Sequence, residues 1–200
     1  ICDALAKNDS VRVAIFRGAG DKAFVSGSDI EQFVNLQHNE AYEIAVDKIF
    51  RSLQHLPFPT IALIEGLAVG SGLLIATACD FRISTPEARF GIPVARTLGN
   101  CLSPSNLSWI SAHLGIPMVK KMLLTSELIH APELLATGYL YATAPASEID
   151  AAADTLANKV AALAPMTQKA SKLTLARLLE SNLPDCTDLM RETYNSQDFK

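Results

Sequence analysis

The longest apolar stretch of the chain, residues 61–79, carries a single charged residue, Glu65. The segment TIALIEG at 60–66 is rich in β-branched residues and predicts a buried strand, LAVGSG at 67–72 predicts a glycine turn, and SGLLIATAC at 71–79 predicts a short apolar helix. In a strand–turn–helix unit, the first backbone N–H groups of the helix have no hydrogen-bond partner within the helix. These N–H groups and the positive end of the helix dipole point toward a ligand bound in front of the turn. The stretch therefore predicts a site for negative charge.

The same stretch is long enough to span a bilayer. However, Glu65 and three glycines interrupt it, at positions 66, 70 and 72, and it lacks interfacial aromatic residues and basic flanks. We therefore expect no membrane span and no membrane partner.

Strand and helix patterns alternate on either side of this stretch. VRVAIFRG at 11–18 predicts a strand, and a Gly- and Ser-rich loop leads from it to helical patterns at 31–37 and 41–56. DFRIS at 80–84 predicts another short strand, and ARF at 88–90 predicts the start of a loop. Strands that alternate with helices favour an α/β fold with crossover connections.

Helical patterns predominate from Pro104 onward, and the clearest amphipathic one covers 146–165. At the other end, ICDALAKNDS at 1–10 reads as the last turns of a helix, so we expect the beginning of that helix to lie before Ile1. No signal-peptide pattern opens the sequence.

Composition narrows the classes of function. Two hundred residues with 49% hydrophobic content suit one compact domain, and a net charge of −4 with scattered basic residues argues against a nucleic-acid partner. The four histidines are too dispersed to suggest a metal site. The cysteines, Cys2, Cys79, Cys101 and Cys186, stand far apart, which favours a reducing compartment and a cytoplasmic location.

Three segments together, KAFVSGSDI at 22–30, the run from Pro59 to Thr85 and ARFGIP at 88–93, resemble the enoyl-CoA hydratase/isomerase family, the crotonase superfamily. The likeness continues through 114–140. The resemblance implies an α/β spiral of ββα turns with a helical C-terminal region, and we divide the chain into a spiral core at 1–143 and a helical part at 144–200 that takes part in oligomerisation. It also implies a homotrimer or hexamer that acts on an acyl-CoA thioester, with coenzyme A as part of the substrate and no separate cofactor.

In such proteins two backbone N–H groups stabilise the negative charge that a thioester carbonyl oxygen gains in an enolate or a tetrahedral adduct. The matching positions are the amides of Ser28 and Ser71. Without the resemblance, Gly70 and Gly72 could serve only to permit a tight turn and close packing. The residues implied to bind coenzyme A or the acyl group are Ser26, Ser28, Asp29, Ile30, Leu67, Val69, Gly70, Ser71, Pro93 and Val94.

The sequence departs from the family at its acid and base positions. Hydratases of this family carry one glutamate three residues after the second oxyanion amide and another directly after the proline of the FGxP motif; here Leu74 and Val94 stand there. Hydration needs one group to take a proton from water and one to deliver a proton to carbon, which aliphatic side chains cannot do. We therefore do not expect the usual two-glutamate hydration.

The loop at 94–103 offers other candidates for the chemistry. Cys101 could act as a nucleophile or base if its thiol were activated, although a buried cysteine is more often inert. Arg96 could bind a substrate carboxylate, or form an ordinary surface ion pair. Asn100 and Thr97 are the other two candidates in this loop.

Two other functions remain open. The protein could bind acyl-CoA without turnover, since both glutamates are replaced. Ser71 could instead be the nucleophile of a serine hydrolase, which would require a histidine and usually an acid beside it. The flanking sequence VGSGLL supplies no evident base.

Overall fold

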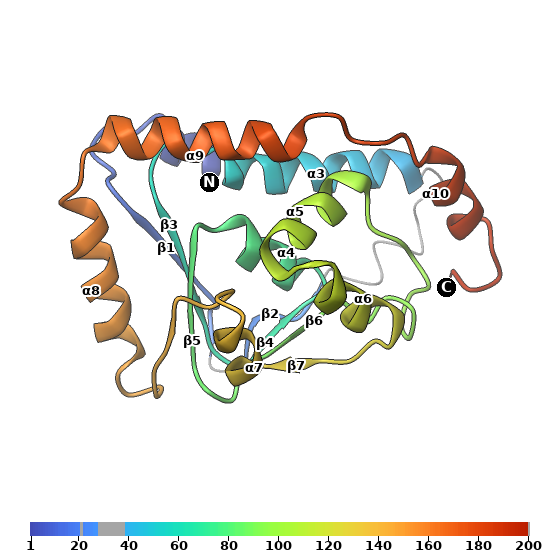
Figure 1. The fold of residues 1–200 in the computed structure, drawn as a ribbon, viewed down its shortest axis with the longest axis horizontal. Helices are drawn as coiled ribbons and strands as arrows, with labels where there is room; N and C mark the ends of the chain where they lie inside the picture. Colours follow the sequence, from blue (N-terminus) through green and yellow to red (C-terminus); the bar gives the residue numbers. More distant parts are fainter. Residues whose placement is uncertain (21, 28–38, 200) are drawn as a thin grey trace.

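The computed structural model describes residues 1–20, 22–27 and 39–199 (Figure 1). The strands of this part are β1 (Ala14–Arg17), β2 (Ala23–Val25), β3 (Thr60–Ile64), β4 (Leu67–Val69), β5 (Phe81–Ser84), β6 (Arg89–Gly91), β7 (Ile129–His130) and β8 (Ala142–Thr143). The helices are α1 (Cys2–Ala6), α3 (Asn39–Gln54), α4 (Ser71–Ala78), α5 (Pro104–Leu114), α6 (Ile116–Leu124), α7 (Ala131–Ala136), α8 (Ile149–Ala161), α9 (Pro165–Glu180) and α10 (Thr187–Tyr194).

The strands form two four-stranded sheets, and successive strands along the chain are added to both sheets. One sheet has the order β1-β3-β5-β8 and is parallel throughout; the other has the order β2-β4-β6-β7, with β7 antiparallel to β6. Each strand pair, β1–β2, β3–β4 and β5–β6, gives one strand to each sheet before the chain continues into helices. This is the predicted spiral of ββα turns, and the α/β fold class is confirmed.

Strand β3 is buried along its whole length because helices cover both faces of its sheet. Ile61 and Leu63 pack with residues of α8, whereas Ala62 and Ile64 belong to the larger core that includes Leu73 of α4. Figure 1 shows α8 on one side of the β1-β3-β5 sheet and α4 on the other. This arrangement explains why the apolar run in the sequence shows no alternation with polar residues.

Helix α4 lies close against strand β2. Gly70, with φ 60°, leads into the helix at a backbone conformation that favours glycine. A Cβ atom on Gly72 would stand 2.0 Å from the carbonyl oxygen of Val25, so this position has no room for a side chain. The two glycines thus fix where the first turn of α4 meets the end of β2.

Several boundaries differ from the sequence-based prediction. Residues 67–69, expected to form part of a turn, are strand β4, and 89–91, expected to open a loop, are strand β6. Arg89 is paired with Leu67 on one side and His130 on the other, and pairing with distant segments cannot be read from so short a run. The helix expected at 41–56 spans Asn39–Gln54, and the one expected at 31–37 lies outside the described residues.

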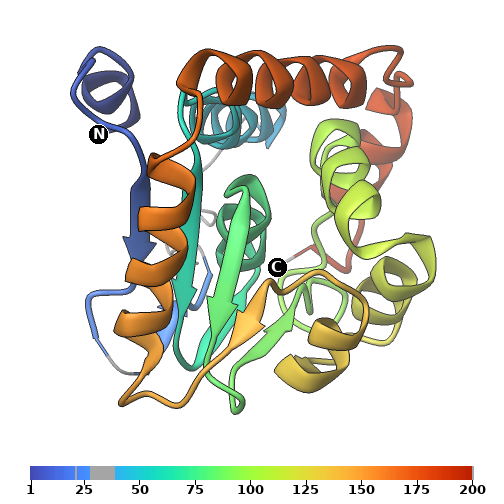
Figure 2. The ribbon, with the colours of Figure 1, turned by 60° about the vertical axis from the view of Figure 1, so that its left-hand side comes forward.

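The C-terminal part is helical after the last strand ends at Thr143. Helix α9 runs along α3 in both views (Figures 1 and 2), and Arg51 and Glu180 form an ion pair between these helices at 3.2 Å. The division at residue 143, and a role of 144–200 in oligomerisation, stay predictions. In the part of the chain that the structure describes, no helix is both long and apolar enough to cross a membrane.

Candidate active site

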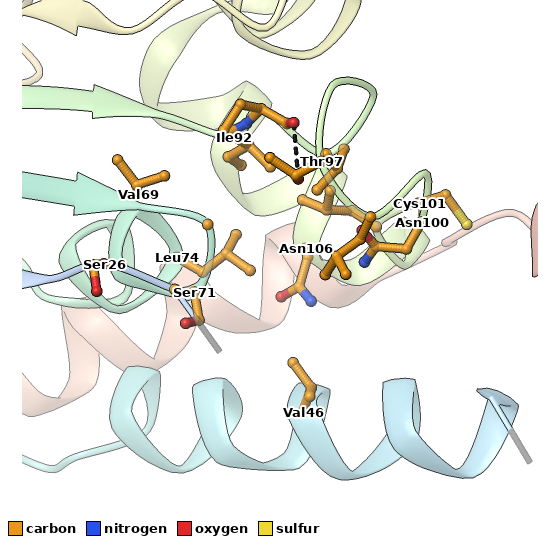
Figure 3. A pocket seen from close by; sticks show the side chains of 16 residues that line it. Ser26, Val46, Val69, Ser71, Leu74, Ile92, Thr97, Asn100, Cys101 and Asn106 are labelled. Atoms are coloured by element: carbon orange, nitrogen blue, oxygen red, sulfur yellow. Dashed lines mark hydrogen bonds between the residues drawn. The ribbon is translucent and has the colours of Figure 1, made fainter. Parts of the chain in front are cut away.

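A pocket of about 170 Å³ opens where the predicted site segments meet (Figure 3). The end of β2, the turn from β4 into α4, the loop after β6, and single residues of α3 and α5 form its wall. The residues that line it are Ser26, Gly27, Val46, Val69, Gly70, Ser71, Leu74, Ile92, Pro93, Val94, Thr97, Leu98, Asn100, Cys101, Leu102 and Asn106. An engineered cavity of about 150 Å³ can hold benzene, so this pocket has room for a short acyl group.

Ser71 is the first residue of α4, and its backbone N–H belongs to the helix turn whose amides have no partner inside the helix. The amide of the preceding Gly70 donates to the carbonyl oxygen of Gly91 at 2.9 Å, which ties this turn to β6. Among the described residues, no hydrogen bond takes up the amide of Ser71. This donor therefore remains available at the pocket wall, at the positive end of the helix dipole.

Only one of the two predicted oxyanion donors can be described. Ser28, Asp29 and Ile30 lie outside the described residues, while Ser26 and Gly27, which directly precede them, line the pocket. Among the other predicted binding residues, Val69, Gly70, Pro93 and Val94 line the pocket as well, and Leu67 does not.

The two positions where hydratases of the family carry glutamates both face this pocket. Leu74 is buried and Val94 is half-buried, and Val69, Ile92 and Leu98 extend the apolar wall beside them. No Asp, Glu, Lys, Arg or His side chain of the described residues lines the pocket. In this part of the chain, the polar lining consists of hydroxyl, amide and thiol side chains together with backbone groups.

The loop after β6 carries the four candidates for chemistry, and they do not all lie at the pocket. Its turn is held by backbone hydrogen bonds, including Gly99 N–H to the Val94 carbonyl oxygen at 2.8 Å, and by the Thr97 hydroxyl, which donates to the Pro93 carbonyl oxygen at 3.0 Å. Cys101 and Asn100 line the pocket. Arg96 is exposed and lines a different hollow, next to Asp198.

A polar cluster that the sequence analysis missed lies behind the pocket wall. The Asp47 carboxylate on α3 accepts a hydrogen bond from the Ser103 hydroxyl at 2.7 Å and one from the Asn106 side-chain amide at 2.8 Å. Burial raises the pKa of the Asp47 carboxyl, and the hydrogen bond from Ser103 opposes this shift. Ser103 also accepts from the Asn106 backbone N–H at 3.2 Å and so caps α5.

The SPSN segment at 103–106 is a recognisable N-cap signal for α5, with proline in the first turn. Nothing in the sequence indicates that the cap is shared with Asp47, which lies on a different helix between Val46 and Lys48. The Asn106 side chain is buried, and its position on the pocket wall follows from the packing of α5 against α4 and from its hydrogen bond to Asp47 of α3.

The described residues contain no group of three or more His, Cys, Asp or Glu side chains that could hold a metal ion. Ser71 has no described histidine beside it in the pocket, since His55, His113 and His130 all lie elsewhere, and His38 is outside the described residues. Among the residues described, the arrangement offers the Ser71 amide as a donor for negative charge but no histidine base for nucleophilic attack by Ser71.

Comparisons with known proteins identify the family of this chain. The sequence model of the enoyl-CoA hydratase/isomerase family matches residues 2–199, and the chain belongs to that family. It is 32% identical to the short-chain-enoyl-CoA hydratase of Clostridium acetobutylicum, over 97% of this chain and 77% of the relative, and 30% identical to the crotonyl-CoA hydratase of Syntrophomonas wolfei, over 96% and 74%. A solved structure of an enoyl-CoA hydratase/carnithine racemase from Magnetospirillum magneticum superposes with a TM-score of 0.83 at 31% identity, covering 97% of this chain and 73% of that one.

Proposed function

We propose that the protein binds an acyl-CoA thioester in this pocket and stabilises negative charge on the thioester carbonyl oxygen. The backbone amide of Ser71 is one donor, and that of Ser28 is proposed as the second. The observation that carries the proposal is the available Ser71 N–H at the first position of the buried helix α4, directly on the pocket wall. One such donor typically contributes about 3 kcal/mol of transition-state stabilisation.

The apolar wall supports enolate stabilisation. A pocket lined by Val69, Leu74 and Ile92 excludes water from the reacting atoms, and electrostatic interactions with the oxyanion are stronger in such surroundings. The relatives named above act on enoyl-CoA or crotonyl-CoA, and this supports an acyl-CoA as the ligand here. Coenzyme A would then enter as part of the substrate.

We further propose that the protein does not perform the usual two-glutamate hydration, because Leu74 and Val94 cannot transfer protons. Incubation with crotonyl-CoA tests this. We expect crotonyl-CoA to bind while the absorbance of its conjugated enoyl group stays constant over many equivalents of substrate. Rapid loss of that absorbance would contradict the proposal and would require a proton-transfer group elsewhere.

The alternatives lead to different observations. A purely binding homologue would retain acyl-CoA affinity and show no turnover with any acyl-CoA tested. A serine hydrolase would be labelled at Ser71 by a fluorophosphonate, and we expect no such labelling because no described histidine lies beside Ser71.

The proposed trimer or hexamer has a candidate surface in the C-terminal part. Met166, Leu175 and Leu178 of α9 are all exposed large apolar side chains. Light scattering after size exclusion would reveal the assembly, and a monomer at micromolar concentration would contradict it. The cytoplasmic location likewise stays a proposal, based on the dispersed cysteines.

A further inference from the structure

The Asp47 carboxylate determines how the Asn106 side chain is oriented in the pocket. An ionised carboxylate only accepts hydrogen bonds, so both of its partners must present donors. Ser103 presents its hydroxyl at 2.7 Å and Asn106 its NH2 group at 2.8 Å. The Asp47 carboxylate therefore fixes the orientation of the Asn106 amide group. The NH2 group of Asn106 faces Asp47, and its side-chain oxygen points away from Asp47.

That oxygen is directed into the pocket. Figure 3 shows the Asn106 oxygen on the side of Leu74 and Ser71, with the nitrogen turned the other way. Asn106 is buried, at 4% relative exposure, and lines the pocket. Among the described residues, no hydrogen bond reaches its side-chain oxygen, which leaves an acceptor for a ligand.

Within the described part of the chain, a second amide with an unpaired oxygen lies near Asn106. The Asn100 side-chain oxygen is buried and has no hydrogen-bond partner among the described residues, and Asn100 lies on the same side of the pocket as Asn106 (Figure 3). A buried acceptor without a partner costs free energy, and this oxygen is closed off from solvent, so a ligand would reach it only after a shift of the loop.

We propose that Asn106 is a specificity residue that accepts a hydrogen bond from a hydroxyl group on the acyl chain, with Asp47 as its positioning residue. The inference rests on the proposed function, since it assumes that an acyl-CoA occupies this pocket. A hydroxyl suits the site better than an ammonium group because Val69, Leu74 and Ile92 would strip water from a full charge. A carboxylate is disfavoured, because no Lys or Arg among the described residues lines the pocket to pair with it.

Isothermal titration with butyryl-CoA, 3-hydroxybutyryl-CoA (both enantiomers) and 4-hydroxybutyryl-CoA tests the proposal, because these ligands have the same chain length and differ in the hydroxyl. A neutral hydrogen bond predicts that at least one hydroxylated ligand binds about two- to tenfold more tightly than butyryl-CoA. Equal affinity for all of them would overturn this inference and leave the proposed function intact. Failure to bind any of them would overturn both.

Variants separate Asn106 from its positioning residue. In Asn106→Leu the ratio of the affinities for the hydroxylated ligand and for butyryl-CoA should fall to about one, because leucine offers the hydroxyl no acceptor. This ratio cancels any change in packing that affects both ligands alike. Asn158→Leu, an exposed asparagine on α8, is the matched control and should keep the preference. A preference that persists in Asn106→Leu would contradict the role of Asn106.

Asp47→Ala and Asp47→Asn give a test that does not depend on Asn106→Leu folding. The carboxamide of Asp47→Asn still offers an oxygen to Ser103 and Asn106, so we expect it to retain the preference, whereas Asp47→Ala should lose it. If Asp47 had a purely structural role, the variants would change the unfolding midpoint but would leave the ratio of the affinities for hydroxylated ligand and butyryl-CoA unchanged. Equal preference in Asp47→Ala and the wild type would overturn the positioning role.

Discussion

The Lys172 ammonium group on α9 lies 2.6 Å from the Asp80 carboxylate, which stands two residues after the end of the short helix α4. Asp80 also accepts from the Thr60 backbone N–H at 2.7 Å and from the Thr60 hydroxyl at 2.8 Å, while Lys172 donates to the Phe58 carbonyl oxygen at 3.0 Å. One ion pair thus joins the C-terminal helix, the start of β3 and the end of α4. Both side chains are partly buried, so solvent screens the pair less than a surface pair.

Replacing Lys172 by Met should therefore lower the free energy of unfolding by about 1 to 3 kcal/mol, because Asp80 and the Phe58 carbonyl lose a charged donor. Urea denaturation followed by circular dichroism measures the effect. Lys159→Met, on an exposed position of α8, is the control and should change stability by less than about 0.5 kcal/mol. Equal effects of the two substitutions would show that the ion pair does not stabilise the fold.

Gly72→Ala tests the close contact between α4 and β2. The added Cβ would stand 2.0 Å from the Val25 carbonyl oxygen, so either the strand or the helix must move. We expect a loss of about 1 to 3 kcal/mol in the free energy of unfolding, together with weaker acyl-CoA binding, since the Ser71 amide moves with the helix. Gly20→Ala, where no atom of the described residues lies within 4 Å of the new Cβ, should be close to neutral. A neutral Gly72→Ala variant would refute this packing.

The Cys79 thiol should be inert in the folded protein. Burial raises the pKa of this thiol to about 12, so almost no thiolate is present at pH 8, and the side chain is 1% exposed. Alkylation with iodoacetamide followed by peptide mass spectrometry should leave Cys79 unmodified in native protein and fully modified in urea. Rapid modification of Cys79 without denaturant would mean that the core around it opens readily.

His113 should make stability depend on pH. Burial lowers the pKa of its imidazole, while its hydrogen bond to the Trp109 carbonyl oxygen opposes the shift. The unfolded chain then binds more protons than the native state below the ordinary pKa near 6.5, so stability falls as pH falls through and below that value. The loss of unfolding free energy between pH 7.5 and 5.5 should be smaller in His113→Gln than in the wild type, by urea denaturation at each pH. Parallel pH profiles would contradict a buried neutral imidazole.

Much of the site could be predicted from the sequence because its parts are local. The strand, turn and helix from Thr60 to Ala78 lie within one stretch, and the family resemblance of that stretch marked the positions of Ser71 and Leu74. Val94 follows the FGIP segment in the same local way. All three line the observed pocket.

The parts that could not be predicted depend on contacts between distant segments. Asp47 and Asn106 are 59 residues apart, and a polar residue on a helix is more often solvated than shared with another helix. Arg96 and Asn100 are close together in the sequence of the loop after β6. The backbone hydrogen bonds of this loop determine that Asn100 lines the pocket while Arg96 lines another hollow.

The central claim is that the Ser71 backbone N–H stabilises an oxyanion, and it can be tested by removing that one hydrogen-bond donor. Proline is tolerated at the first position of a helix, so Ser71→Pro deletes the N–H, whereas Ser71→Ala retains it. The probe is a propionyl-CoA that carries a nitronate group, whose delocalised charge mimics a thioester enolate; plain propionyl-CoA serves as the neutral reference, and melting curves check that both variants fold.

We predict that the wild type and Ser71→Ala bind the nitronate at least tenfold more tightly than propionyl-CoA, and that Ser71→Pro loses this margin, in line with the cost of removing one oxyanion donor. Folded Ser71→Pro that keeps the full preference for the nitronate would contradict the account.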